Sequence, residues 1–121
     1  MQDNLRKWGT GCLRRISSSE PFRDLIYCSP ARGREREIAP HPSLKPQRFL
    51  RQIVRASLPL GQGTILDPFM GSGSTIAAAM ACGVFGIGIE SNDEYYAMAV
   101  RAIPPLSRLS VSNGAGDGAD R

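Results

Sequence analysis

Cysteine is scarce in this sequence, and its three cysteines, Cys12, Cys28 and Cys82, show no C-x-x-C spacing. An odd number of cysteines without that spacing excludes a disulfide framework and gives no reason to expect a zinc site. Because unpaired cysteines are typical of reducing compartments, we expect a cytoplasmic protein. The single histidine, His41, indicates no metal or catalytic site by itself.

Long hydrophobic runs are absent as well. The most apolar window, from Ile76 to Ile89, spans 14 residues and contains three glycines, so it is too short and too interrupted to cross a bilayer. No apolar run follows the basic residues near the N-terminus, and we therefore expect no signal peptide and no membrane partner. A length of 121 residues is sufficient for one small domain.

Acidic residues are few in the first half of the chain, and basic residues are few in the second. Residues 1–63 contain 12 Lys and Arg against 5 Asp and Glu, whereas residues 64–121 contain 3 against 6. This division is typical of a protein that meets nucleic acid with one part and binds a cationic ligand with the other. A basic segment that is only solvated surface gives the same pattern, and composition alone leaves both interpretations open.

Residues 64–75, T-I-L-D-P-F-M-G-S-G-S-T, predict a strand, a tight turn and the start of a helix. The first residues are apolar and β-branched, which is typical of a buried strand. Asp67 ends this strand, a proline follows it, and Gly71 and Gly73 flank small hydroxyl residues. Residues 76–82 favour a helix that the next glycine ends. Backbone N–H groups and a helix dipole are therefore expected to face a ligand at the turn.

The details of this turn exclude two common ligands. A phosphate-binding P-loop needs a lysine after its last glycine, and Ser74 occupies that position. The dinucleotide-binding fingerprint needs a glycine or alanine where Ile76 stands. The carboxylate of Asp67 repels a pyrophosphate but attracts a ligand with a sulfonium and an ammonium group. S-adenosyl-L-methionine is a ligand of this kind.

A second acid follows the next predicted strand, which covers residues 84–89. Glu90 stands at the carboxyl end of this strand, the edge of an open α/β sheet at which ligands bind. It lies 17 residues after Gly73, close to the offset of about 20 residues that is typical of an acid accepting the ribose hydroxyls. The two acids together predict a site for a cationic nucleoside ligand.

Three elements of the sequence resemble one enzyme family. D-P-F-M-G-S-G-S-T (67–75) resembles the cofactor loop of bacterial DNA methyltransferases that methylate the N6 amino group of adenine or the N4 amino group of cytosine. H-P-S-L-K-P (41–46) resembles the H-P-x-x-K-P element that precedes this loop in the permuted class, whose cofactor loop lies near the C-terminus. The segment after the loop resembles the corresponding segment of the family at G-I-E (88–90), Tyr95, Tyr96, Ala99 and Arg101. The resemblance is clear from about residue 40 to residue 106.

The resemblance implies an α/β fold, a partial S-adenosylmethionine-dependent methyltransferase (Rossmann-like) fold with helix–strand–helix–strand–helix order and parallel strands. It implies S-adenosyl-L-methionine as the cofactor and double-stranded DNA as a partner, in an enzyme of a restriction–modification system. The residues that it assigns to cofactor binding are Asp67, Pro68, Phe69, Met70, Gly71, Ser72, Gly73, Ser74, Thr75, Glu90, Ser91, His41 and Lys45.

Three parts of the chain are expected on this basis. Residues 1–40 form an irregular basic segment at the end of a target-recognition region, and residues 41–106 form the cofactor-binding part. Residues 107–121 are rich in Ser, Gly, Ala and Asp and predict a disordered tail. Within the second part, a helix is expected from Pro46 to about Ser57, with its apolar residues on one face and Gln47, Arg48, Arg51, Gln52 and Arg55 largely around the other.

The last predicted helix is expected to begin with a capping box, in which Ser91 is the N-cap and Glu94 the N3 residue. It should run to about Ala102, because Pro104 and Pro105 follow.

The family's catalytic element, [D/N/S]-P-P-[Y/F/W], is missing from the sequence. The one Pro-Pro pair, 104–105, stands between Ile103 and Leu106 and has neither the polar acceptor nor the aromatic residue. The resemblance therefore implies the C-terminal part of such an enzyme, without catalytic residues and inactive alone, with a missing N-terminal catalytic half or another subunit as its partner. A non-catalytic nucleotide- or cofactor-binding module and a non-functional gene remnant remain the alternatives.

Overall fold

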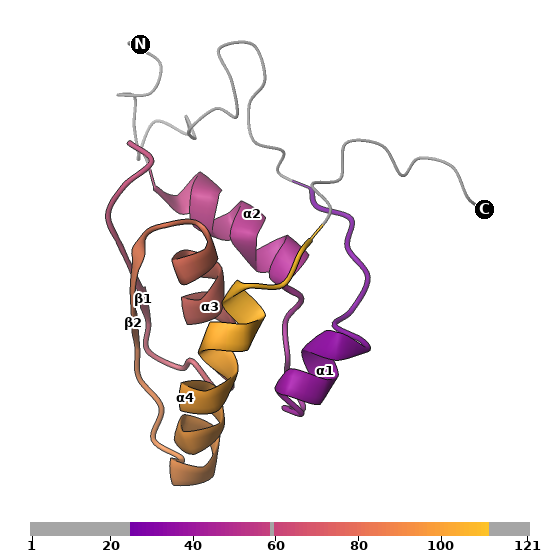
Figure 1. Ribbon diagram of the computed structural model, residues 1–121. Coiled ribbons are helices and arrows are strands. Elements are labelled where there is room, and N and C mark those ends of the chain that lie inside the picture. The colour runs from indigo at the N-terminus through magenta and orange to yellow at the C-terminus, as the bar shows by residue number, and fades with distance from the viewer. Residues whose placement is uncertain (1–24, 59, 112–121) are drawn as a thin grey trace, which may run out of the picture.

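The computed structural model describes residues 25–58 and 60–111 (Figure 1). Along the chain it contains the helices and strands α1 (Arg34–Ile38), α2 (Gln47–Ser57), β1 (Thr64–Asp67), α3 (Ser74–Ala81), β2 (Phe85–Gly88) and α4 (Asp93–Ser107). From α2 onward this is the predicted order of helix, strand, helix, strand and helix. The helix α1 lies in the segment that was expected to be irregular.

The two strands form a two-stranded parallel sheet. Thr64 pairs with Phe85 at the start of the register, and Asp67 pairs with Gly88 at its end. Parallel strands need a crossover connection, and α3 provides it between β1 and β2. The predicted partial α/β fold with parallel strands is confirmed.

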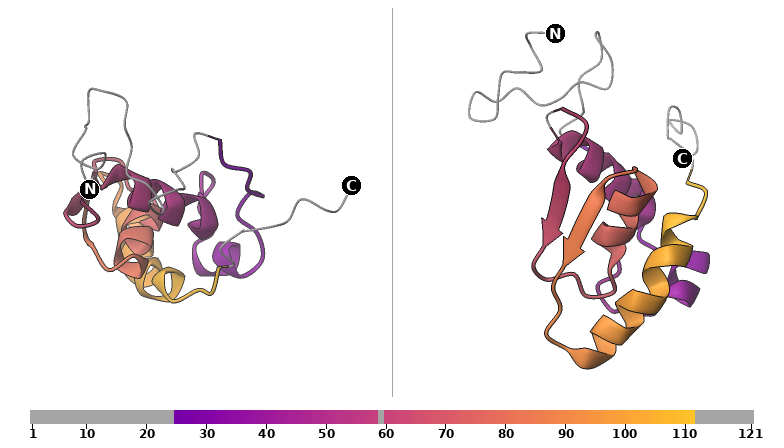
Figure 2. Two further views of the ribbon diagram at one scale, coloured as in Figure 1. Left: turned by 90° about the horizontal axis from the view of Figure 1, so that it is seen from above. Right: turned by 60° about the vertical axis from the view of Figure 1, so that its left-hand side comes forward.

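The three longer helices lie on the same side of the sheet (Figures 1 and 2). The helix α3 packs on the sheet because its alanines, Ala77–Ala79, are fully buried and allow a close approach. A Cβ atom on Gly86 of β2 would lie 3.3 Å from the Cβ of Ala79. The helices α2 and α4 then pack against α3, so the core lies between the helices and one face of the sheet.

The strands differ from the expectation that they are buried. Exposed and half-buried residues alternate along both β1 and β2, and the outward residues include Leu66 and Ile87, which are 61% and 55% exposed. The apolar run was correctly interpreted as a strand. Its outer face is uncovered because, among the described residues, all the helices that contact the sheet lie on the other side.

The buried face of α2 also differs from the prediction. The helix begins at Gln47 with Pro46 as its N-cap, one residue later than expected. Gln47 is fully buried and Arg51 is 8% exposed, whereas Ile53 of the predicted apolar face is 39% exposed. The two polar side chains are buried because carbonyl groups of α3 and α4 lie within reach of them.

The guanidinium group of Arg51 ties the end of α4 to α2. Its Nη2 donates to the carbonyl oxygens of Leu106 and Ser107 at 3.1 and 3.2 Å. Carbonyl groups in the last turn of a helix have no partner within the helix and attract cations. Burial lowers the pKa of Arg51, but an arginine stays protonated in proteins. The contact is therefore charged.

Both ends of α4 differ from the sequence prediction. Its N-cap is Asn92, whose Oδ1 accepts the N–H of Tyr95 at 3.0 Å, so the capping box on Ser91 was wrong by one residue. The helix continues through Pro104 and Pro105 to Ser107. The φ angle of proline is compatible with a helix, although each proline removes one backbone donor. The buried side chain of Leu106 and the contact from α2 hold the last turn in place.

Several predictions lie partly or wholly outside the described residues. Most of the basic segment precedes residue 25, and the predicted tail is described only to residue 111. Residues 25–32 form neither a helix nor a strand. No helix in the described ranges has the length and apolar character needed to cross a membrane.

Candidate functional site

The two predicted acids lie at the same edge of the sheet. Asp67 is the last residue of β1 and pairs with Gly88, and Glu90 follows two residues later. The N–H of Ile89 donates to the carbonyl oxygen of Asp67 at 2.9 Å, and the N–H of Met70 donates to the carbonyl oxygen of Ile89 at 3.0 Å. The carboxyl ends of both strands and the loop after β1 therefore form one surface.

Both carboxylates accept hydrogen bonds from backbone groups. Glu90 Oε2 accepts the N–H of Gly71 at 2.9 Å, and its Oε1 accepts the N–H of Asn92 at 2.8 Å. Asp67 Oδ1 accepts the N–H of Phe69 at 3.0 Å. Each carboxylate oxygen has more than one acceptor position, so both groups retain the capacity to bind a donor on a ligand.

The turn between β1 and α3 depends on two glycines with positive φ angles. Gly71 has φ +53° and Gly73 has φ +77°, values that residues with a side chain rarely adopt. A Cβ atom on Gly73 would also lie 2.6 Å from Cγ1 of Ile103 and 3.1 Å from Cβ of Ala99. The glycine therefore allows both the turn and the close packing of α4 against it. Gly73 is the N-cap of α3.

The turn that contains His41 borders this loop. The imidazole of His41 lies 3.2 Å from the position of a Cβ atom on Gly71. It also packs edge-on against the ring of Tyr95, with the ring centroids 4.4 Å apart. His41 Nδ1 accepts the N–H of Ser43 at 3.1 Å. His41 thus stabilises its own turn through a hydrogen bond, and its imidazole also lies beside the glycine loop.

A sequence model of the DNA methylase family matches residues 7–101 of the chain. The chain belongs to this family. It is 44% identical over 71 residues to the DNA adenine methyltransferase YhdJ of Escherichia coli, an alignment that covers 59% of this chain and 24% of the relative. It is 33% identical over 87 residues to the type II methyltransferase M2.DpnII of Streptococcus pneumoniae, with 72% of this chain and 32% of the relative covered.

A solved structure resembles this chain in fold. It is the crystal structure of the M1.HpyAVI–SAM complex, with a TM-score of 0.60 and 32% sequence identity. The likeness covers 80% of this chain and 44% of that one. The chain therefore spans less than a third of the length of the curated relatives named above, and less than half of the solved one.

Three predicted site residues are buried parts of the loop. The sulfur of Met70 occupies the space that a Cβ atom on Gly88 would need. Ser72 and Ser74 are buried, and their hydroxyl oxygens lie 3.0 Å apart. These side chains support the shape of the loop.

Other predicted site residues lie at the surface. Pro68, Phe69 and Ser91 are exposed and Thr75 is half-buried. Lys45 is exposed, and its Nζ donates to the carbonyl oxygen of Ser43 at 3.2 Å. The structure thus brings His41 to the glycine loop, whereas the ammonium group of Lys45 stays with its own turn.

Sequence reasoning missed Gln47 as a residue that supports the site. Its Nε2 donates to the carbonyl oxygen of Ser74 at 2.9 Å, which fixes the first turn of α3 against α2. Tyr95 was named only as part of the family resemblance, and its contact with His41 was not predicted. Both contacts join residues that are far apart in the sequence, and no local pattern indicates them.

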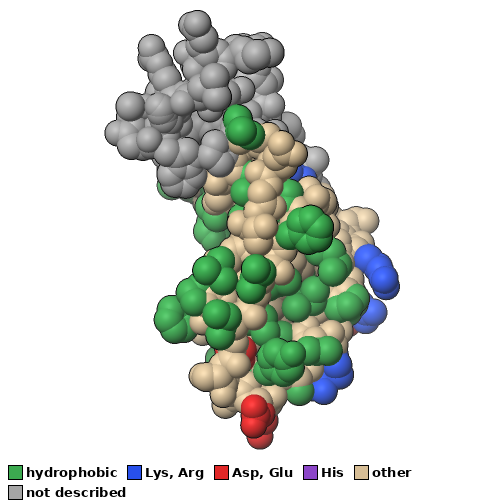
Figure 3. Space-filling model, turned by 90° about the vertical axis from the view of Figure 1, so that its left-hand side faces the viewer, with side chains coloured by type: hydrophobic (Ala, Val, Ile, Leu, Met, Phe, Trp, Pro, Cys, Tyr) green, Lys and Arg blue, Asp and Glu red, His purple; other side chains and the backbone are tan. Residues whose placement is uncertain are grey.

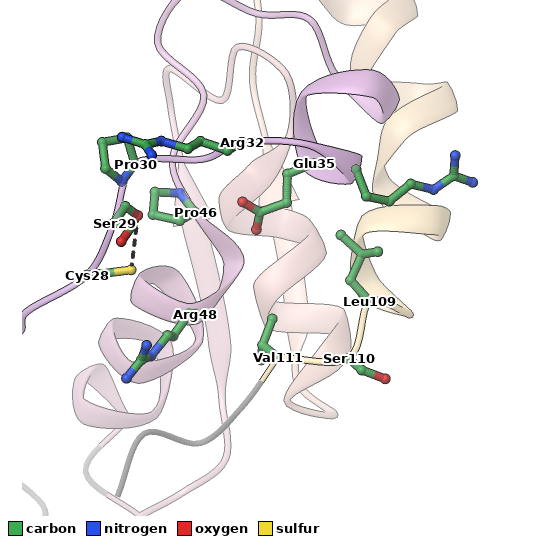
Figure 4. Close-up of a pocket in the computed structure, with 11 residues that line it drawn as sticks. Cys28, Ser29, Pro30, Arg32, Glu35, Pro46, Arg48, Leu109, Ser110 and Val111 are labelled. Carbon is green, nitrogen blue, oxygen red and sulfur yellow. Dashed lines mark hydrogen bonds between the residues drawn. The ribbon is translucent and has the colours of Figure 1, made fainter. Parts of the chain in front are cut away.

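A separate cavity of about 450 Å³ lies between the segment before α1, the first turn of α2 and the chain after α4 (Figure 4). Among the described residues, Arg32, Arg34 and Arg48 are the basic residues at its border, and Glu35 is the acid that lines it. The carboxylate of Glu35 accepts the N–H of Gln47 at 2.7 Å. Three arginines of the basic half of the chain thus lie at one cavity.

Proposed function

We propose that this chain is the S-adenosyl-L-methionine-binding portion of a DNA methyltransferase that acts on the N6 amino group of adenine or the N4 amino group of cytosine. The observation that supports it most is the position of Asp67 and Glu90 at the carboxyl ends of two adjacent parallel strands. The glycine loop lies between them, and its backbone is held by Glu90. The ligand binds at this edge in open α/β sheets.

The residues at this edge fit the proposed cofactor. S-adenosyl-L-methionine has a sulfonium and an ammonium group, and a carboxylate at the mouth of the turn attracts both. Asp67 is the acid nearest the start of the loop, and Glu90 has free acceptor positions for ribose hydroxyls. His41 and Tyr95 form an aromatic wall beside Gly71. The cofactor-binding set is proposed as residues 67–75, Glu90, Ser91, His41 and Lys45.

The bound cofactor supplies an electrophilic methyl group, and this chain's residues hold and orient it. Pro104 and Pro105 are inside α4 and cannot serve as the family's amino-activating element. The chain alone is therefore proposed to be inactive. Methyl transfer in the complete enzyme needs a polypeptide that provides this element, whether an N-terminal catalytic half or another subunit.

Double-stranded DNA is proposed as the substrate of the complete enzyme. Residues 1–63 have a surplus of seven positive charges, and arginines of this half border the cavity of Figure 4. Arginines of this kind contact phosphates and position the duplex. By analogy with the type II relative, we place the enzyme in a restriction–modification system of the cytoplasm.

Calorimetric titration of the purified chain with S-adenosyl-L-methionine, S-adenosyl-L-homocysteine and NAD tests the cofactor assignment. The expected result is saturable binding of the first two and much weaker binding of NAD, because a pyrophosphate is repelled by Asp67. A preference for NAD, or the absence of binding by a chain that circular dichroism shows to be folded, would contradict the proposal.

The helical position of the Pro-Pro pair also supports a second candidate, a non-catalytic cofactor-binding module. The two candidates differ in what happens when the rest of a methyltransferase is added. Transfer of tritium from labelled cofactor to DNA after that addition supports the enzyme portion. Cofactor binding without transfer under the same conditions supports the module.

A further inference from the structure

One polar residue is buried completely in a protein that exposes apolar residues elsewhere. Figure 3 shows hydrophobic side chains spread over the sheet side of the molecule, with acidic residues at one end. Gln47, the first residue of α2, is by contrast 0% exposed, although glutamine is mostly exposed in proteins. Burial of a polar side chain costs stability unless its hydrogen bonds are replaced, so the contacts of Gln47 need an explanation.

The side chain of Gln47 makes one hydrogen bond and leaves one acceptor unpaired. Its Nε2 donates to the carbonyl oxygen of Ser74, the first residue of α3, at 2.9 Å. Its Oε1 is buried and has no partner among the described residues. An apolar side chain of similar volume fills the same space between α2 and α3 without burying an unpaired carbonyl. Packing alone therefore favours an apolar residue at this position, and the bond to Ser74 is what the amide adds.

Gln47 is itself held in place by its surroundings. Its backbone N–H donates to Oε1 of Glu35 in α1 at 2.7 Å. Pro46 precedes it, and the proline ring fixes the φ angle of the residue before the helix. The amide therefore starts from a fixed backbone, so its bond sets the position of the partner carbonyl. Functional groups are held in productive geometry by supporting side chains of this kind.

The bond to Ser74 acts on a peptide group at the ligand edge. The C=O of Ser74 and the N–H of Thr75 belong to one planar unit and point in opposite directions. Because the first N–H groups of a helix point out of its N-terminus, holding this carbonyl also aims the N–H of Thr75 at the carboxyl edge of the sheet. Ala77 is the first residue of α3 whose N–H reaches a backbone carbonyl, that of Gly73, at 2.9 Å. Within the described ranges, the N–H groups of residues 74–76 have no such acceptor and can bind a ligand.

We propose that Gln47 is a positioning residue for the cofactor. Its amide fixes the peptide group between Ser74 and Thr75, so that the N–H groups at the start of α3 meet the ligand in one orientation. Gln47 does not touch the ligand, because it is fully buried between α2 and α3. The inference rests on the proposed function, which supplies the ligand. The amide then raises affinity at a cost in stability, a combination that a residue with only a structural role does not produce.

Replacing Gln47 with Met tests this role, because Met keeps the volume and removes both the donor and the unpaired acceptor. Thermal denaturation should give a Tm equal to or above that of the parent chain. Calorimetric titration should show that the affinity for S-adenosyl-L-methionine falls about three- to tenfold, the range that one hydrogen bond contributes. The matched control Gln52→Met makes the same change on the same helix, at a half-buried residue whose Nε2 donates to the carbonyl oxygen of Arg48 at 3.4 Å. It should leave both the Tm and the affinity unchanged.

The free chain provides a second measurement that needs no ligand. NMR relaxation should give lower order parameters for the N–H groups of Thr75 and Ile76 in Gln47→Met than in the parent and the control. Parental order parameters or parental affinity would overturn the proposal. A variant that loses Tm together with affinity, or that does not fold, would also overturn it, since the amide would then serve the fold itself. A parent chain that binds no S-adenosyl-L-methionine contradicts the proposed function, and the order parameters then decide the role of Gln47 alone.

Discussion

The carboxylate of Glu90 and the backbone N–H of Gly71 are joined by a hydrogen bond of 2.9 Å. The other oxygen of the same carboxylate accepts the N–H of Asn92. One side chain thus fixes the glycine loop after β1 and the turn before α4 in a single position. The acid that the sequence suggested for a ligand is also a structural link between the two loops that border the site.

Replacing Glu90 with Gln tests this link. The amide has almost the same size, but its NH₂ group cannot accept a hydrogen bond, so one of the two N–H groups loses its partner. We expect the free energy of unfolding to fall by about 1–3 kcal/mol, measured by urea denaturation. The control Glu94→Gln changes an exposed acid of α4 and should stay within about 0.5 kcal/mol of the parent. Equal stabilities of the two variants would contradict the link.

Replacing Asp67 with Ala tests the electrostatic part of the proposed cofactor site. We expect affinity for S-adenosyl-L-methionine to fall about tenfold or more, equivalent to about 1.4 kcal/mol, because the cationic ligand loses the acid at the mouth of the turn. The loss should persist at about 0.3 M salt, since a direct contact is screened less than a distant one. Calorimetry with the control Glu37→Ala, which removes an exposed acid of α1, should give the parent affinity. Unchanged binding by Asp67→Ala would show that the ligand lies elsewhere.

Replacing Gly73 and Gly83 with Ala separates backbone strain from side-chain overlap. Both glycines have nearly equal φ angles, +77° and +74°, so each substitution costs about 1 kcal/mol in backbone conformation. A Cβ atom meets Ile103 at position 73 and nothing within 4 Å at position 83. We therefore expect Gly73→Ala to lower the free energy of unfolding by about 1–3 kcal/mol more than Gly83→Ala. Thermal denaturation of both variants checks this, and equal Tm values would refute the close packing of α4 on the turn.

Replacing Arg51 with Ala removes the contact between α2 and the end of α4. Two carbonyl groups lose a charged donor, and we expect destabilisation by about 2–4 kcal/mol. Arg55 lies one turn later on α2 and is half-buried, so Arg55→Ala is the matched control and should cost less than about 1 kcal/mol. Hydrogen exchange should also show faster exchange in the last turn of α4 in Arg51→Ala alone. A variant with the parent stability would mean that α4 holds its C-terminal turn without α2.

The sequence by itself determined the order of the elements and the neighbourhood of the two acids. Apolar and β-branched residues before Asp67 predicted β1, and glycines at 71 and 73 predicted the turn, because these are local preferences of the backbone. The end of α3 was also predictable from a glycine at position 83. Gly83 has a positive φ angle, and its N–H donates to the carbonyl oxygen of Met80 at 3.0 Å, as is typical of a glycine that ends a helix. Two parallel strands bring their carboxyl ends to one edge, and this placed Asp67 near Glu90 without further information.

Only the tertiary structure decided which polar side chains are buried and how far α4 extends. Gln47 and Arg51 were assigned to the outer face of α2, because helical periodicity ranks residues by their own polarity. Their partners are carbonyl groups 27 and 55 residues away in the chain, and no local pattern indicates such contacts. The same reason explains why α4 continues through Pro104 and Pro105. Proline weakens a helix locally, but the packing of Leu106 and the hydrogen bonds from Arg51 compensate for this loss. These contacts exist only in the folded chain.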